Sequence, residues 1–436
     1  MMCILPKIDT TDMMLDKMKN KKNTKMFFFL RHNNDIDHIV PVIYKWVNTK
    51  KTPTEVIITS RRKHLNDFRI KFIQKFDNVK IFYIDDLLDK ISLTRLFNLL
   101  YTKYSGKLDR LFRKYKTIQR LSDKFFKKIA ESIFKNVDAA VLTFDWTDTY
   151  FAEYMVKYAK KREFISVSLP HGDAPYVNDM ETNEQFINLD VFWNGHQIFD
   201  MFDYVVVPNK WCLKRYSRYL NEKKIKMLGS ARYSDEWMSI LSDIKKQHTV
   251  NLGDKKIKIV LFLRNIYYPI FWDELARTIL VISKFSNLFL IIKHHPRGKN
   301  MMHKFKKVNK LPNVIHVFEG ISSDALMNWA DIIMDTGTST IWEAIKTGKP
   351  VLSLEFLHSN YSTSAYYIKN SEIRYRDQLY HFLKRVNDKG IKELDNFYNE
   401  DERRRFIEEV IDVPDRNVLE RYVEFLEECL NESIKE

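Results

Sequence analysis

The sequence predicts an α/β protein with two doubly wound parallel sheets that face each other across a cleft. Short apolar runs alternate with helical stretches in two successive series along the 436 residues, the pattern that builds parallel sheets. Several of these apolar runs end in polar turns that contain His, Gly or Thr. In doubly wound sheets such turns collect at the carboxyl edge of the strands, where ligands bind.

The two series also give the predicted domain organisation, since each is as long as one ordinary domain. The linker between them is predicted at a polar stretch that ends in Asn-Leu-Gly-Asp. The predicted parts are an N-terminal lead-in (1–23), a first domain (24–235) that carries a basic helical insertion (86–136), a linker (236–255), a second domain (256–390) and C-terminal helices (391–436).

The strands are predicted from short apolar runs bounded by turn-forming residues. In the first half they are residues 25–30, 55–59, 79–84, 139–144, 164–169 and 204–207. In the second half they are residues 256–263, 288–292, 314–318, 332–334 and 351–354. The intervening segments carry apolar residues at helical spacing, which predicts helices at 35–48, 64–76, 147–160, 210–219, 272–285, 301–308, 324–330 and 370–386.

Composition narrows the function classes. The net charge of +15 favours acidic partners such as phosphorylated substrates or anionic surfaces. The three cysteines, Cys3, Cys212 and Cys429, lie far apart, which argues against a disulfide framework and fits a reducing compartment. No apolar run reaches the ~18–20 residues of a membrane span, and the N-terminus lacks a signal-peptide core. We therefore expect a cytoplasmic protein, with peripheral contact to the inner face of the cell membrane through its basic surface.

One strand–turn–helix–strand unit in the second half is suited to anion binding. Gly337 lets the backbone approach a ligand, and Thr338, Ser339 and Thr340 offer hydroxyl groups. The N–H groups at the start of the following helix favour an anion such as a diphosphate. One helical turn further on, Glu343 is placed to hold the vicinal hydroxyls of a ribose. The alternative is that Thr338 only caps the helix.

A cationic turn follows the strand predicted at 288–292. It contains His294, His295, Pro296 and Arg297, and cations at a strand end suit phosphate binding. Pro296 fixes the turn so that an imidazole is aimed consistently. The alternatives are a solvated basic loop and, less favoured because adjacent side chains point apart, a paired-histidine metal site.

Two other strand ends carry cationic and polar residues. Arg264 ends the first strand of the second domain, where it is positioned to reach a diphosphate, with a plain surface charge as the alternative. Arg31, His32, Asn33 and Asn34 end the first strand of the first domain. They line the acceptor side in one interpretation and cap the following helix in the other.

A histidine turn ends the strand predicted at 164–169. His171 precedes Gly172 and Asp173, and a histidine at this position is suited to take a proton from an attacking hydroxyl group. Asp173 or Asp145 could orient the imidazole or replace it. The alternative is a turn histidine that only satisfies the backbone.

Other motifs limit the partners. Residues 102–128 form the strongest basic patch, which is either a solvated helix face or a contact for anionic lipid or a polyanion. The aromatic residues fit cores and helix faces and show no base-stacking pattern, so no nucleic-acid partner is predicted. The chain contains no GxGxxG, Walker A or EF-hand pattern, which argues against dehydrogenases and P-loop NTPases. We predict no metal.

In chain order, these motifs resemble the GT-B glycosyltransferase superfamily. The nearest similarity is to the capsule and teichoic-acid polymer enzymes, the CDP-glycerol glycerophosphotransferase-like group, and to bacterial sialyl- and polysialyltransferases. The resemblance implies that His295-Pro296 and Thr338–Thr340 hold the nucleotide phosphates of a donor, and that His171 is a candidate base. Glu343-Ala344, followed by Gly348-Lys349-Pro350, is more similar to sugar-nucleotide transferases and UDP-N-acetylglucosamine 2-epimerases.

The resemblance implies an enzyme that transfers a sugar or a glycerol phosphate onto a growing cell-surface polysaccharide of capsule, teichoic-acid or lipopolysaccharide type. The donor would be CDP-, CMP- or UDP-linked, the acceptor a glycan or lipid-linked chain, and no cofactor is expected. Fixed dipoles can stabilise a departing diphosphate without a metal. The alternatives are a sugar-nucleotide 2-epimerase, which needs additional acid/base carboxylates, and a non-catalytic polyanion-binding protein.

Overall fold

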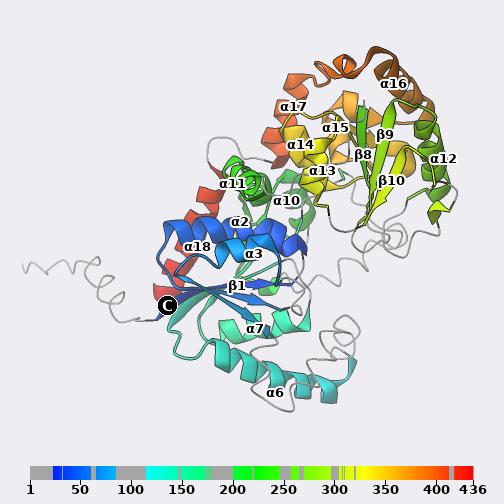
Figure 1. The fold of residues 1–436 in the computed structure, drawn as a ribbon. Helices are drawn as coiled ribbons and strands as arrows, with labels where there is room; N and C mark the ends of the chain where they lie inside the picture. Colours follow the sequence, from blue (N-terminus) through cyan, green and yellow to red (C-terminus); the bar gives the residue numbers. More distant parts are fainter. Residues whose placement is uncertain are drawn as a thin grey trace, which may run out of the picture.

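The computed structural model contains two parallel α/β sheets joined by helices, as predicted (Figure 1). The residues that it describes are 23–31, 33–59, 65–84, 114–145, 149–172, 176–177, 200–218, 220–245, 257–264, 270–295, 304–306, 308, 310–318, 321–411 and 417–435. Among them, no helix is both long enough and apolar enough to cross a bilayer.

The first sheet has seven parallel strands in the order β3-β2-β1-β4-β5-β6-β7. Its central strand β4 is buried along its whole length, and its one hydroxyl group, on Thr143, donates to the Phe27 carbonyl of β1. The strand bounds are β1 Thr24–Leu30, β2 Thr54–Ile58, β3 Val79–Tyr83, β4 Ala139–Phe144, β5 Ile165–Ser168, β6 Tyr204–Val207 and β7 Ile225–Met227.

The second sheet has six parallel strands in the order β10-β9-β8-β11-β12-β13. Four of them, β8, β9, β11 and β12, are almost entirely buried apolar runs, as expected for strands covered on both faces. The strand bounds are β8 Ile257–Phe262, β9 Leu288–Lys293, β10 Val314–Val317, β11 Ile332–Asp335, β12 Val351–Leu354 and β13 Glu372–Ile373.

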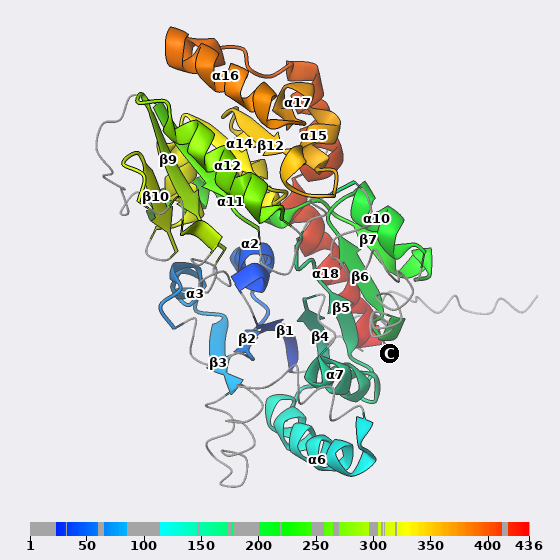
Figure 2. The same cartoon turned by 90° about the vertical axis from the view of Figure 1, so that its right-hand side faces the viewer.

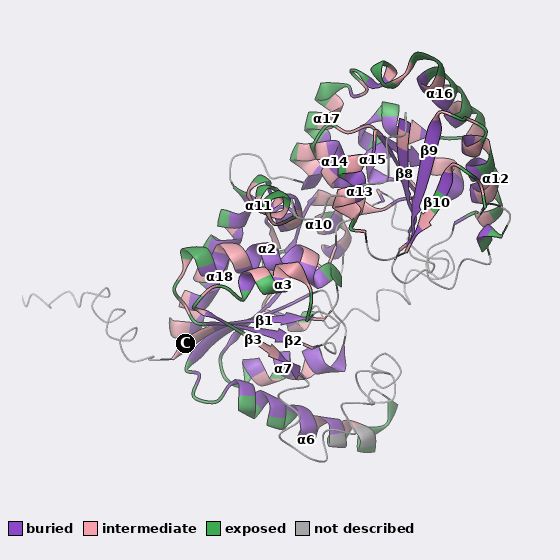
Figure 3. Ribbon diagram, in the orientation of Figure 1, coloured by how far each residue is buried: buried purple, intermediate pink, exposed green. Residues whose placement is uncertain are grey.

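Helices cover both faces of each sheet (Figure 3). On the first sheet, α6, α7 and α10 pack against one face and α2, α3 and α18 against the other. Their bounds are α2 Asn33–Thr49, α3 Phe68–Ile73, α6 Lys116–Ile133, α7 Tyr150–Lys160, α10 Lys210–Tyr216 and α18 Val418–Lys435. On the second sheet, α12 and α16 pack against one face and α13, α14, α15 and α17 against the other. Their bounds are α12 Trp272–Ser283, α13 Ser323–Trp329, α14 Trp342–Lys346, α15 Thr363–Tyr367, α16 Arg376–Lys389 and α17 Glu400–Phe406.

The last helix, α18, returns to the first sheet after the chain has completed the second (Figures 1 and 2). Leu419, Tyr422 and Leu426 are fully buried in the same cluster as Met26 and Val141 of the central strands. The preceding helix α17 packs on the second sheet instead. The C-terminal helices therefore tie the two sheets together.

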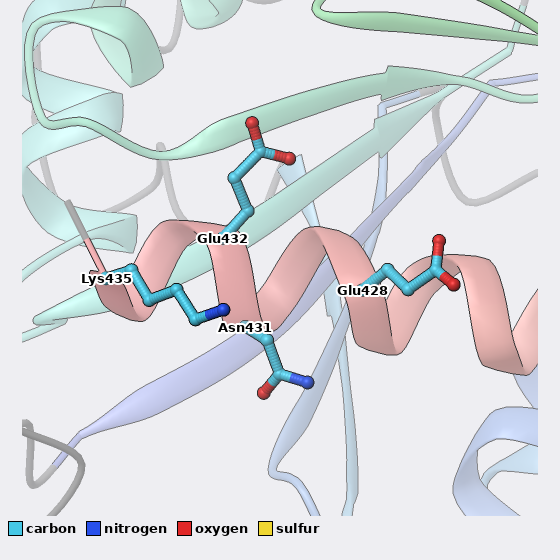
Figure 4. Close-up of a pocket in the computed structure, with 4 residues that line it drawn as sticks. All are labelled: Glu428, Asn431, Glu432 and Lys435. Carbon is cyan, nitrogen blue, oxygen red and sulfur yellow. The ribbon is translucent and has the colours of Figure 1, made fainter. Parts of the chain in front are cut away.

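The C-terminal half of α18 also carries charged and amide side chains, of which Glu432 accepts a hydrogen bond from the Tyr204 hydroxyl group of β6. A surface hollow there is lined by Glu428, Asn431, Glu432 and Lys435, all from this one helix (Figure 4). None of the predicted site residues lies in it.

The predicted linker contains a helix, α11 (Asp235–Lys245), because Trp237 gives this segment an apolar side that packs against α2 and α3. Of the predicted insertion at 86–136, the structure describes residues 114–136, and α6 is helical there as expected. The predicted lead-in falls outside the described residues except for Asn23. The domain boundaries themselves stay a prediction.

We expect Leu426→Ala to lower the free energy of unfolding by about 2–5 kcal/mol, because it removes a fully buried side chain from the contact of α18 with the first sheet. Denaturant unfolding followed by the fluorescence of the buried Trp46 and Trp237 would measure the change. The exposed Glu428→Ala on the same helix is the control, with an expected effect within about 0.5 kcal/mol. Equal effects would contradict the packing of α18 described above.

Candidate active site

Each sheet reverses the direction of its strand order once. The first sheet reverses between β1 and β4, and the second between β8 and β11. In open α/β sheets, ligands bind beyond the carboxyl ends of the strands at such a switch point.

At the first switch point, an imidazole lies between two carboxylates. Nδ1 of His171 is 2.7 Å from Oδ1 of Asp35 and 2.9 Å from Oδ2 of Asp145. Both aspartate side chains are almost fully buried, whereas the His171 side chain is 28% exposed. The imidazole of His171 thus lies between a buried pair of carboxylates and the solvent.

Local structure places each of these three groups. Asp35 lies in the first turn of α2, directly after β1, and its Oδ2 accepts the Arg31 backbone N–H at 2.6 Å. Asp145 directly follows β4, and His171 lies three residues after β5. One oxygen of Asp35 is therefore fixed by the backbone, which leaves the other aimed at the imidazole.

The carboxylates control the protonation of the cluster. Burial alone would lower the pKa of His171, but hydrogen bonds to Asp145 and Asp35 outweigh it and raise that pKa to about 10. Burial, together with the charge of Asp35, raises the pKa of Asp145 to about 6. At neutral pH the imidazole is therefore predominantly an imidazolium ion that compensates two carboxylates.

The outer nitrogen of His171 has a different neighbour. Nε2 is 3.4 Å from Nδ2 of Asn34, a long contact compared with those at Nδ1. An amide N–H directed at Nε2 suits the neutral imidazole, because only that form has an acceptor lone pair there. The cluster thus has a stable protonated form and a proton-accepting form whose lone pair lies away from the carboxylates.

The same cluster could hold a divalent cation. Ligand atoms of Asp35, Asp145 and His171 all lie within 4.8 Å of one another. A metal ion bound through Nδ1 would take the place of the proton that Nδ1 shares with the carboxylates, because only the unprotonated nitrogen is a ligand. Proton and metal are therefore competing occupants of one position, and the sequence-based expectation of no metal stays a prediction.

At the second switch point, the turn after β11 is closed by its own carboxylate. Oδ2 of Asp335 accepts the backbone N–H groups of Gly337 and Thr338 at 2.7 and 2.8 Å. Burial raises the pKa of Asp335 to about 6 although these hydrogen bonds oppose the rise. Thr338 Oγ1 in turn accepts the Thr340 N–H.

These contacts occupy N–H groups at the turn that were expected to be free for an anion. The helical segment after the turn is a 3-10 turn (Ser339–Ile341) followed by the five-residue α14, and the backbone N–H groups of Gly337, Thr338 and Thr340 already have partners in the chain. An anion here would depend on the half-buried hydroxyl groups of Thr338, Ser339 and Thr340 and on nearby cations. Glu343 lies half-buried in the first turn of α14.

Arg264 contacts the turn at 336–340 directly. It is the second residue after β8, is 8% exposed, and its backbone N–H donates to Thr336 Oγ1 at 3.2 Å. The structure therefore brings Arg264 and the turn at 336–340 together at the second switch point. That they hold a diphosphate stays a prediction.

The two adjacent histidines at the end of β9 have different environments. His294 is buried, with its ring stacked on Phe318 at 4.0 Å and its Nε2 2.9 Å from His316 Nδ1. Burial, then the neighbouring His316, lowers the pKa of His294 to about 3, so it is neutral. His295 is half-buried. The packing thus favours a structural role for His294 and leaves His295 as the ligand candidate.

Three predicted site residues, Asp173, Pro296 and Arg297, lie outside the described residues. Two residues that the structure brings to the switch points, Asp35 and Tyr176, were not predicted from the sequence. Asp35 is within a stretch that resembles a helix start, and Tyr176 is within a stretch that resembles a polar loop. The position of Asp35 soon after a strand end was a usable signal, whereas Tyr176 had none.

Comparisons with known proteins identify the fold. No protein-family model matches the chain, and no curated protein matches it. Among solved structures, it is similar to a UDP-GlcNAc 2-epimerase from Neisseria meningitidis bound to UDP-GlcNAc, with a TM-score of 0.58 and 14% identity over 93% of this chain and 100% of that one. It is also similar to the S. aureus MnaA–UDP structure (TM-score 0.56, 13% identity, 94% and 97% coverage).

A third similar structure is the Methanocaldococcus jannaschii UDP-GlcNAc 2-epimerase in complex with UDP-GlcNAc and UDP (TM-score 0.55, 14% identity, 93% and 99% coverage). At these identities the likeness shows the fold alone. The chain has a GT-B-like fold, which confirms the predicted fold class.

We expect Asp35→Asn to lower the pKa of His171 by more than one unit toward its ordinary value of about 6.5, because the amide cannot stabilise the imidazolium as a carboxylate does. An NMR pH titration of ring-labelled histidine would measure it. Asp37→Asn is the matched control, since Asp37 lies on the same helix but pairs with Arg69 and Arg232. An unchanged His171 pKa in Asp35→Asn would contradict the proposed ion pair, and a Mn²⁺-dependent change in the titration would indicate a metal there instead.

Proposed function

We propose that the protein transfers a sugar or glycerol phosphate from a nucleotide-activated donor to a hydroxyl group of a growing surface glycan. The observation that carries this proposal is the His171 cluster, in which one imidazole at a sheet switch point is backed by two buried carboxylates. Support for the donor comes from the GT-B-like fold, which is shared with enzymes whose structures contain UDP-GlcNAc or UDP.

In the proposed reaction, the acceptor oxygen forms a bond to the transferred group while the bond from that group to the nucleotide phosphate breaks. Nε2 of His171 takes the acceptor proton, and the departing nucleotide keeps the electron pair of the broken bond. Asp35 and Asp145 stabilise the imidazolium that results. A base with a pKa near 10 is strong but mostly protonated at pH 7, so its reactive fraction grows as the pH rises.

On the donor side, the departing nucleotide gains negative charge. Arg264 is bound to the turn by its backbone N–H, and its guanidinium group lies over the ring of Tyr176, whose hydroxyl group bonds the same turn. Thr338, Ser339 and Thr340 supply hydroxyl groups. His295 adds a donor from the end of β9, and Glu343 is our candidate for the ribose hydroxyls. Preorganised cations and dipoles of this kind stabilise developing charge without rearranging during the reaction.

The second candidate function is a sugar-nucleotide 2-epimerase. The similarity of its fold to UDP-GlcNAc 2-epimerases and to a UDP-bound structure favours it. An epimerase must remove and return protons on opposite faces of a ring carbon. Asp35 and Asp145, however, both point at one nitrogen of His171. One such cluster supports a single proton transfer, and this favours the transferase.

The basic surface is consistent with a polyanionic acceptor or an anionic membrane. Helix α6 buries Phe125, Phe126 and Ile129 and exposes its cations, Lys116, Arg120, Lys124, Lys127 and Lys128. A non-catalytic polyanion-binding protein would use this surface alone. It would need no buried carboxylate–imidazole cluster, which is why we rank that function below the two enzymes.

We expect UDP to raise the melting temperature of the wild-type protein, because a ligand at about 100 times its Kd adds about 2.7 kcal/mol of stability. His295→Ala should abolish most of this rise and leave the melting temperature without nucleotide nearly unchanged. His294→Ala is the matched control: it should lower the melting temperature by opening the buried cluster, yet keep the response to nucleotide. If no response appears to UDP, CDP or CMP, the donor site is absent.

We expect His171→Gln to reduce transfer by about 10²–10⁴-fold, the usual contribution of a general base. Product formation would be followed by mass spectrometry with UDP- and CDP-linked donors and a glycan acceptor. In wild type the rate should rise with pH through neutrality, since deprotonation of the imidazolium creates the base. Conversion of UDP-GlcNAc to UDP-N-acetylmannosamine without acceptor would instead select the epimerase.

A further inference from the structure

Four aromatic side chains lie together where helices α10 and α15 come close to each other (Figure 2). Trp211 belongs to α10 on the first sheet, whereas Tyr361, Tyr366 and Tyr367 lie in or shortly before α15 on the second. The ring centroids of the other three lie 5.4, 6.2 and 5.1 Å from that of Tyr366. We call these four residues the aromatic cluster.

The aromatic cluster has a buried part and an exposed part. Tyr367 is buried, and its hydroxyl group accepts the Trp211 Nε1–H at 3.2 Å and donates to Glu409 at 2.7 Å. Tyr366, in contrast, is 46% exposed, although its ring has edge-to-face contacts with three neighbouring rings. A ring that is held in this way and is still accessible loses little conformational entropy when it binds a ligand.

Cationic groups surround the aromatic cluster. The Nζ atoms of Lys210 and Lys214 lie 5.6 and 5.9 Å from the ring centroid of Trp211, and the Arg405 guanidinium lies over another ring of the cluster at 5.6 Å. Glu409 pairs with Lys210 and Arg405. Positive charge is in excess among these four charged groups, which favours an anionic ligand.

The aromatic cluster lies on the same edge of the first sheet as the proposed base. Helix α10 begins directly beyond the carboxyl end of β6, which places Trp211 there. Strand β6 pairs with β5, whose carboxyl end leads to His171. Parallel strands end at the same edge, and adjacent strands are only about 4.8 Å apart. The two positions are therefore within the reach of one short oligosaccharide.

We propose that the aromatic cluster is a subsite for an anionic glycan, the acceptor of the proposed reaction. Sugar rings present C–H faces that pack on accessible aromatic rings, and Tyr366 offers such a ring. Carboxylate or phosphate groups on the glycan would pair with Lys214 and Arg405, whose side chains are exposed. The inference rests on the proposed function, because it assigns the glycan bound here to the transfer at His171.

The experiment is isothermal titration calorimetry on the full chain, at low salt and without nucleotide. The anionic probe is a hyaluronan hexasaccharide, which carries a carboxylate on every second sugar, and the neutral probe of equal length is maltohexaose. The anionic probe should bind at least about tenfold more tightly. Tyr366→Ala should weaken its binding about fivefold or more, whereas Tyr366→Phe, which keeps the ring, should bind like wild type.

Two further variants make the test specific. Tyr380→Ala is the matched control, since Tyr380 is also an exposed tyrosine but lies on α16, against the other face of the second sheet. It should leave the affinity for the anionic probe unchanged. Lys214→Gln changes an exposed side chain and should weaken the anionic probe without affecting the neutral one. Equal melting temperatures would show that each variant is folded.

Several results would overturn the inference. They are a failure of the anionic probe to bind, equal affinity for the two probes, and binding that survives Tyr366→Ala. Binding that survives Tyr366→Ala and Lys214→Gln would place the glycan on another basic surface, such as that of α6. Binding weakened by Lys214→Gln alone would show charge attraction without packing on the ring.

These results are separate from the tests of the proposed function, because no nucleotide is present. Nucleotide binding and transfer that depends on His171, with no effect of Tyr366→Ala on glycan binding, would overturn the inference alone. Glycan binding at the aromatic cluster without any response to UDP, CDP or CMP would overturn the proposed function, and with it the assignment of this glycan as an acceptor.

Discussion

The charge compensation at the first switch point is the interaction on which the rest of the site depends. Asp35 and Asp145 are nearly inaccessible to water, and two carboxylates so close to one atom cannot both stay ionised there without a cation. The His171 imidazolium supplies that cation. Because β1, β4 and β5 are neighbours in the sheet, three residues far apart in the sequence reach one position. The order of the strands therefore brings the two carboxylates and the imidazole together at this edge of the sheet.

Much of the fold was predictable because strand and helix periodicity are local properties of the sequence. The predicted strand at 139–144 coincides with β4, and the predicted helix at 272–285 nearly coincides with α12. The return of α18 to the first sheet was not predictable, since an amphipathic pattern shows which side of a helix is buried but not against what. Residues 236–245 were predicted as part of the linker because they lead into a polar stretch, but their apolar residues, chiefly Trp237, pack into the core.

Some residues of the candidate site were likewise predictable from the sequence, and others were not. His171, Arg264 and the turn at 336–340 were predictable because each directly follows an apolar run, and strand ends converge in doubly wound sheets. Asp35 was missed because its role depends on a partner 136 residues away. Tyr176 was missed because nothing in a polar loop shows that one aromatic residue will enter the opposite sheet. The sequence analysis could not distinguish His294 from His295 because they are adjacent; in the structure His294 is buried and His295 is half-buried.

The fixed position of the His171 imidazole also determines which part of the site can move. Moving His171 away from its carboxylates would leave buried charge uncompensated, and breaking such a pair costs several kcal/mol. The proposed base is therefore fixed to the first sheet. The proposed donor turn is built from short elements, a 3-10 turn and a five-residue helix, held by side-chain contacts such as that of Asp335. In the proposed reaction any adjustment would accordingly fall to the second sheet, and the hydrogen bond from the Tyr176 hydroxyl group to the Thr336 carbonyl is one contact at which the first half of the chain meets it.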